Sequence, residues 1–347
     1  MSHRVAVLEG AGRVVLRAED LPAPKPGEAL VRLRACALCT MEQRLWTGHI
    51  DEYPIVAGHE AAGVVVDVHP EAVAPPLGSR VALAMLDRCM QCYACRRGDT
   101  HLCTGKFRGR EPGKMRRIGG LADHVCVPTW KLFAMPDDLS FDEIAFAEPL
   151  ACVVHSVNKG AVRLGDDVLV IGGGTMGQLH LMIARLRGAR VFVSEPDSNK
   201  RRVALEHGAA LAIEPEAAAA RVRELTEGRG ADVVFVTHGT HATAEHAAVS
   251  VRAGGRIIYY GSFSADIGTH LGPRRIHNDE TVLDGARSHT LDDWGQATKL
   301  LAYRLVDVQR LISSRLPLEQ IAEALEQASR ASDFRVVVHM NEGTQQR

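Results

Sequence analysis

The 347-residue chain has almost no net charge and no long apolar run. Its 41 Lys and Arg residues stand against 42 Asp and Glu residues, so its formal charge of −1 gives no reason to expect nucleic acid or an anionic membrane as a partner. The amino-terminal segment MSHRVAVLEGAGRVVL lacks the apolar core of a signal peptide, and the sequence has no run of 18 apolar residues that could span a membrane. We therefore expect a cytoplasmic protein.

Length and composition indicate an ordinary globular protein of about two domains, at roughly 150 residues each. The hydrophobic content of 46% is ample for two cores. In a chain expected to be cytoplasmic, eight cysteines indicate thiolates and bound metal rather than disulfides.

The most informative stretch runs from residue 168 to residue 195. An apolar run of four residues predicts a buried parallel strand, and it leads directly into Gly172-x-Gly174-x-x-Gly177. Apolar residues at helical spacing follow, and a second apolar run ends beside Glu195. A glycine motif between a strand and a helix, with an acidic residue after the next strand, is the fingerprint of dinucleotide binding. Glycines that serve only a turn are the alternative.

In this fingerprint, the three glycines allow a tight turn, close approach of a pyrophosphate, and close packing of helix on strand. The helix N-terminus offers unpaired N–H groups to the phosphates. Glu195 is placed to accept hydrogen bonds from the adenosine ribose and would repel a 2′-phosphate, which favours NAD over NADP. Three basic residues just downstream, Lys200, Arg201 and Arg202, count against that preference. The expected cofactor-binding residues are Gly172, Gly174, Thr175, Met176, Gly177, Glu195 and Lys200.

Four cysteines form a second pattern, Cys89-x-x-Cys92-x-x-Cys95-x7-Cys103. This spacing, in a loop rich in glycine and polar residues, predicts a closed tetrahedral zinc site with a structural role. An iron–sulfur cluster is the alternative, but the Cys-Pro signature of ferredoxins is missing because Thr104 follows the last cysteine.

A second metal site is indicated more weakly. Cys39 and His59 are suitable zinc ligands, and a β-rich fold could bring them together although they are far apart in sequence. Taken alone, each is more often a packing residue. Glu148 stands in apolar surroundings, where a carboxylate needs a partner such as a metal or metal-bound water. A carboxylate at a helix start, before Pro149, is the alternative reading.

The pattern of elements predicts an α/β protein with a doubly wound parallel sheet and a second, β-rich part. The first 35 residues alternate short apolar runs with turn signals. After Glu195, strands alternate with helices, as a doubly wound sheet requires. We expect strands at 211–213, 232–236, 256–260 and 335–339, and helices at 294–303 and 318–328. The final strand is expected to return to the first domain. The basic segment 106–117 is either a solvated loop or a region that attracts an anionic substrate.

Together, these motifs resemble the medium-chain, zinc-dependent alcohol dehydrogenases over nearly the full length of the chain. The polyol branch, with sorbitol, butanediol and threonine dehydrogenases, is the most similar. The resemblance implies a GroES-like catalytic domain formed by residues 1–155 and completed by 290–347, and a Rossmann NAD-binding domain formed by 156–289. It also implies a homo-oligomer, either a tetramer or a dimer.

The same resemblance implies two zinc ions per chain, one catalytic and one structural. Cys39 and His59 would bind the catalytic zinc, Glu148 would be its third ligand or hold a zinc-bound water, and Glu60 would exchange with that water. The implied activity is hydride transfer between NAD and a secondary alcohol, such as a polyol, a cyclitol or a sugar derivative. Bound zinc would lower the pKa of the alcohol, as it does for water.

The chain departs from the family pattern at Cys39-Thr40-Met41-Glu42, where the family usually shows Cys-Gly-Ser/Thr-Asp. Met41 cannot relay a proton, so we hypothesise that Thr40, or zinc-bound water held by Glu60 or Glu148, does so. Glu42 stands in place of the usual Asp that orients the histidine ligand.

Two further positions differ from the polyol enzymes. Leu45 and Trp46 stand where some of them place a substrate-binding tyrosine, which predicts a less polar or different substrate. Arg287 or His289 could contact substrate, or could belong to a surface loop.

Two other functions stay open at this point. One is an NADP-dependent ketone reductase, and the other is a non-catalytic nucleotide-binding relative with an altered catalytic zinc site. Met41 and Glu42 favour the second. The residues that argue against it are Cys39, His59, Glu60 and Glu148.

Overall fold

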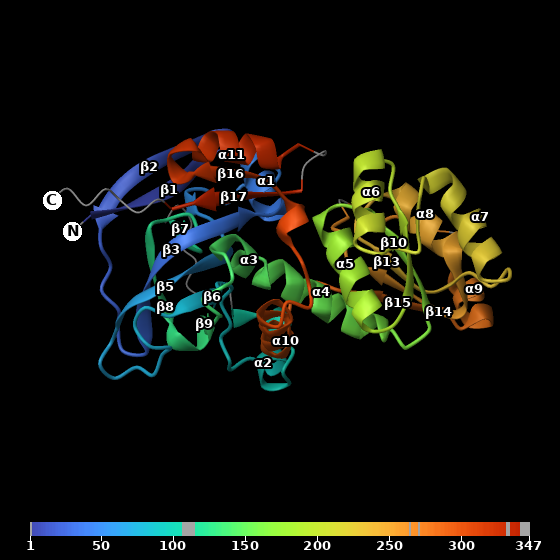
Figure 1. Ribbon diagram of the computed structural model, residues 1–347, viewed down its shortest axis with the longest axis horizontal. Helices are drawn as coiled ribbons and strands as arrows, with labels where there is room; N and C mark the ends of the chain where they lie inside the picture. Colours follow the sequence, from blue (N-terminus) through green and yellow to red (C-terminus); the bar gives the residue numbers. More distant parts are fainter. Residues whose placement is uncertain (1, 106–114, 264, 270, 331–333, 341–347) are drawn as a thin grey trace. The chain divides into compact units, whose positions relative to one another are not determined.

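The computed structural model describes residues 2–105, 115–263, 265–269, 271–330 and 334–340 (Figure 1). The chain divides into two compact units. The first unit comprises Met1–Ala151 and Thr290–Arg347, and the second comprises Cys152–His289. Within the described ranges, no helix is both long and apolar enough to cross a membrane.

Two β-sheets form the framework of the first unit. The strands of the larger are β3 (Glu28–Leu38), β5 (Glu60–Val68), β6 (Arg80–Ala84), β8 (His124–Pro128), β9 (Leu132–Ala134), β16 (Ile312–Pro317) and β17 (Arg335–His339). Their order is β16-β17-β3-β5-β6-β9, and β8 also pairs with β3. The smaller sheet contains β1 (Ser2–Gly10), β2 (Arg13–Asp20), β4 (Ile55–Val56) and β7 (Arg116–Arg117), in the order β2-β1-β4-β7. The C-terminal strand β17 thus pairs with β3, near the start of the chain.

The first unit also contains helices. They are α1 (Thr40–Trp46), α2 (Tyr93–Arg96), α3 (Phe141–Ala145), α10 (Leu291–Ala302) and α11 (Ile321–Ala328). The last of these buries Ile321, Ala324, Leu325 and Ala328, which recur at helical spacing and therefore form one apolar face. This face packs into the core cluster that also holds side chains of β3 and β17.

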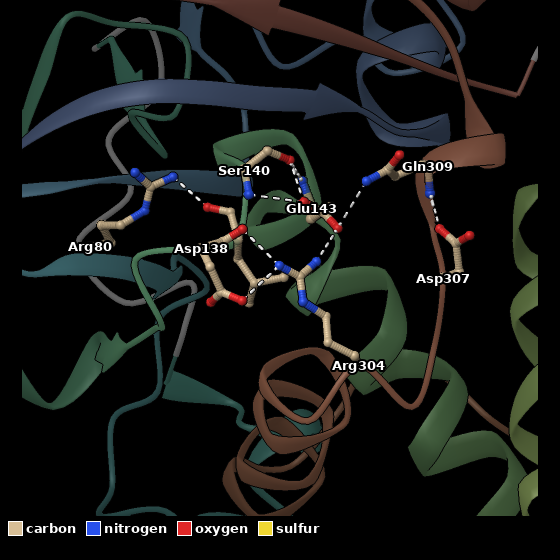
Figure 2. A network of polar contacts seen from close by, with 8 residues as sticks. Arg80, Asp138, Ser140, Glu143, Arg304, Asp307 and Gln309 are labelled. Carbon is tan, nitrogen blue, oxygen red and sulfur yellow. Dashed lines mark hydrogen bonds and ion pairs between the residues drawn. The ribbon is translucent and has the colours of Figure 1, made fainter.

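Polar contacts also join the C-terminal segment of the first unit to its N-terminal segment (Figure 2). Ser140 and Glu143 form a capping box at the start of α3. The Glu143 carboxylate also accepts hydrogen bonds from Arg304 Nη1 at 2.8 Å and from Gln309 Nε2 at 3.3 Å. One capping carboxylate therefore joins segments that lie more than 160 residues apart in sequence.

A parallel sheet forms the centre of the second unit. Its strands are β10 (Asp167–Ile171), β11 (Arg190–Ser194), β12 (Leu211–Ile213), β13 (Ala231–Val236), β14 (Val251–Tyr259) and β15 (Val282–Gly285). The helices that alternate with them are α5 (Thr175–Leu186), α6 (Ser198–Glu206), α7 (Pro215–Leu225), α8 (His241–Ser250) and α9 (Pro273–Asp279). The strand order β12-β11-β10-β13-β14-β15 reverses between β10 and β13. In doubly wound sheets, ligands bind at the carboxyl ends of the strands at this reversal.

The predicted fold class, a doubly wound parallel sheet with a β-rich second part, is confirmed. The strands expected at 211–213 and 335–339 lie at those residues as β12 and β17. The strand expected at 256–260 begins earlier, at Val251, and the helix expected at 318–328 begins with a 3₁₀ turn over Leu318–Gln320. The part of the basic segment at 106–114 lies outside the described residues.

A buried histidine on α5 makes the stability of the second unit sensitive to acid. His180 donates from Nδ1 to the Met176 carbonyl at 2.7 Å, and its Nε2 is 2.8 Å from Ser156 Oγ. Its ring packs against Phe235 and Tyr260. Burial lowers the pKa of His180 to about 4, although the Met176 hydrogen bond opposes this shift. In the folded chain, the side chain of His180 is therefore uncharged at neutral pH.

We predict that this histidine destabilises the fold as pH falls from about 6.5, the ordinary histidine pKa, to about 4. Over that range, His180 is protonated in the unfolded chain but stays neutral in the folded chain, so protonation favours unfolding. The depressed pKa is worth up to about 3 kcal/mol at roughly 1.4 kcal/mol per pKa unit. Denaturant unfolding at several pH values would measure this, with His180→Gln as the neutral control. A difference in unfolding free energy between wild type and variant that does not change with pH would contradict the prediction.

Candidate metal centres and nucleotide site

Strand pairing brings Cys39, His59 and Glu60 together in the first unit. Cys39 is the N-cap of α1, directly after β3, and Glu60 begins β5. Because β3 and β5 are antiparallel, with Ala37 opposite Glu60, the chain segments that hold the three residues are adjacent. Cys39 Sγ lies 3.3 Å from His59 Nε2. One ligand atom from each of the three residues lies within 4.8 Å of the others.

Glu42 fixes two of these residues from a fully buried position. Its Oε1 accepts hydrogen bonds from His59 Nδ1 and from the Gly58 N–H, both at 3.1 Å, and its Oε2 accepts from the Cys39 N–H at 3.1 Å. Burial alone would raise the pKa of Glu42, but His59 and the hydrogen bonds from His59 and Cys39 lower it to about 2. The longer side chain therefore reaches His59 and directs Nε2, the other ring nitrogen, toward Cys39.

Glu60 has one oxygen bonded and one free of protein partners. Its Oε1 accepts a hydrogen bond from Arg335 Nη2 at 2.7 Å, and both side chains are buried. Its Oε2 is buried and has no hydrogen-bond partner among the described residues. Burial raises the pKa of Glu60 to about 7, and Glu148 raises it as well, whereas Arg335 opposes the shift. Sequence reasoning missed Arg335, whose signal is a lone cation at the start of an apolar strand.

This set of donors fits a zinc ion. It offers a sulfur, an imidazole nitrogen and an orphaned carboxylate oxygen, which are the ligand types that zinc prefers. Burial also raises the pKa of Cys39 to about 12, and a bound cation would offset that cost by stabilising the thiolate.

The remaining candidates for the catalytic site lie in different surroundings. Glu148 is buried in the first turn of α4 (Ala147–Gly160) and does not belong to the Cys39–His59–Glu60 group, but its charge acts on Glu60. Thr40 is exposed at the first position of α1, and Met41 packs partly into the core. Leu45 is 1% exposed and belongs to that core. Leu45 therefore contributes packing rather than a contact for substrate.

The four cysteines also converge. Cys89, Cys92, Cys95 and Cys103 each offer a sulfur within 4.8 Å of the others. Backbone N–H groups of Cys95 and Thr104 lower the pKa of Cys92 to about 5, whereas burial raises the pKa of Cys95 to about 12. Four sulfurs this close can all be thiolates only around a cation, so the set fits a closed tetrahedral zinc site.

The glycine-rich loop lies at the carboxyl end of β10, where the strand order of the second unit reverses. Gly172 has a φ of +99°, and a Cβ there would meet Thr237 Oγ1 at 2.5 Å. A Cβ on Gly177 would come within 1.8 Å of the Gly172 carbonyl oxygen. Among the described residues other than its chain neighbours, none has an atom within 4 Å of an ideal Cβ on Gly174, the N-cap of α5, which has no side-chain cap. The open N-terminus of α5 suits a phosphate group.

Glu195 follows β11 and contacts this loop. Its Oε2 accepts from the Gly173 N–H at 2.6 Å, and its Oε1 accepts from the Asp197 N–H at 2.9 Å. The downstream arginines bind other groups. Arg201 donates to the carbonyls of Glu195 and Pro196, and it pairs with a carboxylate on Glu214. Arg202 pairs with Glu206 in the next turn of α6.

Comparison with known proteins identifies the family. Residues 25–137 match the alcohol dehydrogenase GroES-like domain, and residues 175–303 match the zinc-binding dehydrogenase domain. A 2-dehydro-3-deoxy-L-galactonate 5-dehydrogenase from Pseudoalteromonas atlantica is 30% identical over 308 residues, which cover 87% of this chain and 88% of that protein. The chain belongs to the zinc-binding alcohol dehydrogenase family.

Other dehydrogenases of this family are similar over most of the chain. Sorbitol dehydrogenase from Ovis aries is 28% identical and covers 96% of this chain and 95% of its own. A structure of a Sinorhizobium meliloti 1021 protein, described as a zinc-binding dehydrogenase and bound to NADP, is 29% identical. It aligns with a TM-score of 0.88 over 98% of this chain and 99% of that one. The family predicted from the motifs is thereby confirmed.

For Arg287 and His289, the sequence predicts either a contact with substrate or a place in a surface loop. Arg287 is exposed, in line with the loop, whereas His289 is 2% exposed and is therefore not a surface residue.

We predict that loss of the Glu42 charge weakens zinc binding at the Cys39–His59–Glu60 site by roughly 10- to 100-fold, as for other residues that orient a metal ligand. Glu42→Gln removes the charge and at least one acceptor for His59 and Cys39. Competition with a chromophoric chelator at neutral pH would measure the zinc affinity.

Glu42→Asp is the matched control, because it keeps the charge and shortens the reach by one methylene. We expect it to retain more affinity than Glu42→Gln. The four-cysteine site serves as an internal reference that neither substitution should change. Zinc affinity equal to wild type in Glu42→Gln would show that the carboxylate does not organise the site.

Proposed function

We propose that this dehydrogenase oxidises a secondary alcohol by zinc-assisted hydride transfer to NAD. The observation that carries the proposal is the buried set of Cys39, His59 and Glu60, in which Glu60 Oε2 has no partner among the described residues. A buried carboxylate oxygen without a partner is costly unless a ligand satisfies it.

The residues of the chain have separate tasks in this proposal. Cys39, His59 and Glu60 would hold the zinc, and Glu148, whose charge acts on Glu60, would be a further ligand or hold a zinc-bound water. When bound, zinc supplies a Lewis acid that lowers the pKa of an alcohol and polarises a ketone. Glu42 keeps the His59 proton on Nδ1, and Arg335 holds one oxygen of Glu60, so that the other stays available.

The cofactor would bind along the glycine-rich loop. Backbone N–H groups at the start of α5 would face the pyrophosphate, next to Gly172, Gly174, Thr175, Met176 and Gly177. Glu195 would accept hydrogen bonds from the adenosine ribose while it keeps its own contacts to the backbone.

We favour NAD because the groups near Glu195 oppose a 2′-phosphate. Glu195 and Asp197 supply two carboxylates, and Asp197 caps α6 through the N–H of Lys200. Arg201 and Arg202 are paired with other groups. NADP is the alternative, and the relative from Sinorhizobium meliloti that was solved with NADP supports it.

Relatives suggest the substrate class. They act on L-threonine, L-galactonate, D-arabitol phosphate and sorbitol, as their names state. These substrates each carry a secondary alcohol with polar neighbouring groups, so we propose that this chain acts on a polyol, a cyclitol or a sugar derivative. We also propose a homo-oligomer, either a tetramer or a dimer. None of the eight cysteines, all of which lie in the described ranges, forms a disulfide, which supports a reducing compartment such as the cytoplasm.

The direct test is NADH formation across polyols, cyclitols, amino alcohols, sugar phosphates and simple secondary alcohols. We expect turnover with one class, its loss after chelation, and its return when zinc is restored. With the best substrate, kcat/KM should be higher with NAD than with NADP. Chelator-resistant turnover would refute the zinc role, and a preference for NADP would refute the role of Glu195. No turnover, with NAD still bound, would favour the non-catalytic alternative.

The proton route is tested at Thr40, which carries the hydroxyl group of the altered segment Cys39-Thr40-Met41-Glu42. We propose that Thr40 passes on the alcohol proton, because Met41 cannot. Thr40→Val should lower kcat and change its pH profile, roughly within the 10²- to 10⁴-fold range of general acid–base catalysis. Thr40→Ser keeps the hydroxyl and should stay near wild type. An unchanged pH profile in Thr40→Val would leave water near Glu60 or Glu148 as the route.

A further inference from the structure

A cavity of about 400 Å³ lies in the first unit, apart from the proposed zinc site. Arg34 from β3, Arg80 from β6, Phe141 and Asp142 from α3, and His339 from β17 line it. Arg34 precedes Cys39 by five residues, which is about 16 Å along an extended chain at roughly 3.3 Å per residue. None of the ligands proposed for either zinc lines this cavity.

Two guanidinium groups share one aromatic ring in this cavity. Arg80 Cζ lies 3.7 Å from the centroid of the Phe141 ring, and Arg34 Cζ lies 5.2 Å from it. The ring attracts both cations and holds their planes in place. Burial is the largest cause of the lowered pKa of Arg80. The like charge of Arg34 lowers it further, because the two cations repel each other. An anion between them would relieve that repulsion.

Arg80 has few acceptors of its own. A guanidinium carries five N–H donors, and the acceptor that Arg80 has among the described residues is the Leu139 carbonyl oxygen. Its Nε is buried and has no hydrogen-bond partner among the described residues. The nearby carboxylates do not pair with it. Asp138 pairs with Arg304 instead, and Asp137 acts on Arg80 only through its charge.

The one acidic residue that lines the cavity is already neutralised. Asp142 Oδ2 accepts from Arg315 Nε at 2.5 Å, and its Oδ1 lies 2.6 Å from His339 Nε2. With Asp142 occupied in this way, the cavity offers the positive charge of Arg34 and Arg80 to a ligand.

We propose that this cavity binds a small oxyanion, namely the carboxylate or phosphate group of a metabolite, between Arg34 and Arg80. A rigid guanidinium fork matches the oxygens of either group and can bind two of them at once. The volume falls within the range of about 300–1,000 Å³ that is usual for small-molecule sites. The site is separate from the alcohol and the cofactor of the proposed function, so its test does not depend on turnover.

Calorimetric titration of the full-length, zinc-loaded and NAD-saturated protein would test this site, with inorganic phosphate and with succinate as probes. NAD blocks the pyrophosphate site, and low ionic strength limits screening. We expect saturable binding of one anion per chain. Arg80→Gln should weaken it roughly tenfold, which corresponds to about 1.4 kcal/mol. Arg34→Gln tests the same pocket if the Arg80 variant does not fold.

Arg97→Gln is the matched control, because Arg97 also lies over an aromatic ring, that of Tyr93 at 5.6 Å, but does not line the cavity. It should bind both probes as wild type does. Binding of phosphate alone would identify a phosphorylated ligand, and binding of succinate alone a carboxylate, and both support the site. Absence of saturable binding, or binding that Arg80→Gln and Arg34→Gln leave unchanged, would overturn the proposal.

Discussion

The hydrogen bonds of the Glu42 carboxylate organise the proposed catalytic site. One buried side chain accepts from the N–H of Cys39, from the N–H of Gly58 and from the ring of His59. The same carboxylate completes the capping box of α1, so the helix start and the ligand geometry depend on each other. Burying a carboxylate costs several kcal/mol unless it is bonded, and here each carboxylate oxygen is bonded to a residue that we propose as a zinc ligand.

The proposed carboxylate ligand, Glu60, is held by a residue that is distant in sequence. Its partner Arg335 lies 275 residues away in sequence, on the C-terminal strand. The pairing of β17 with β3 brings the two together. The proposed catalytic site, in the first half of the chain, therefore has its Glu60 contact only when the last described strand is in place. This gives a physical reason for a first unit that is made of two separate segments.

The sequence predicts what is local and misses what depends on tertiary contacts. Two motifs can be predicted from their spacing almost alone, because each forms within a short stretch of chain. They are the four cysteines at 89, 92, 95 and 103 and the glycines at 172–177. The reach of Glu42 to His59 could not be predicted, since it depends on how β3 and β5 pair. Arg335 carried no motif at all. Leu45 stands where some polyol enzymes place a tyrosine, but its burial in the core of the first unit depends on tertiary packing that the sequence does not show.

Anomalous diffraction at the zinc edge, from crystals grown with zinc, tests the central claim most directly. The account predicts two peaks per chain. One would lie among Cys39 Sγ, His59 Nε2 and Glu60 Oε2, with His59 Nδ1 still bonded to Glu42, and the other would lie among the four cysteine sulfurs. A single peak, at the four cysteines, would contradict the account, because the Cys39 site would then be a buried polar cluster without a metal.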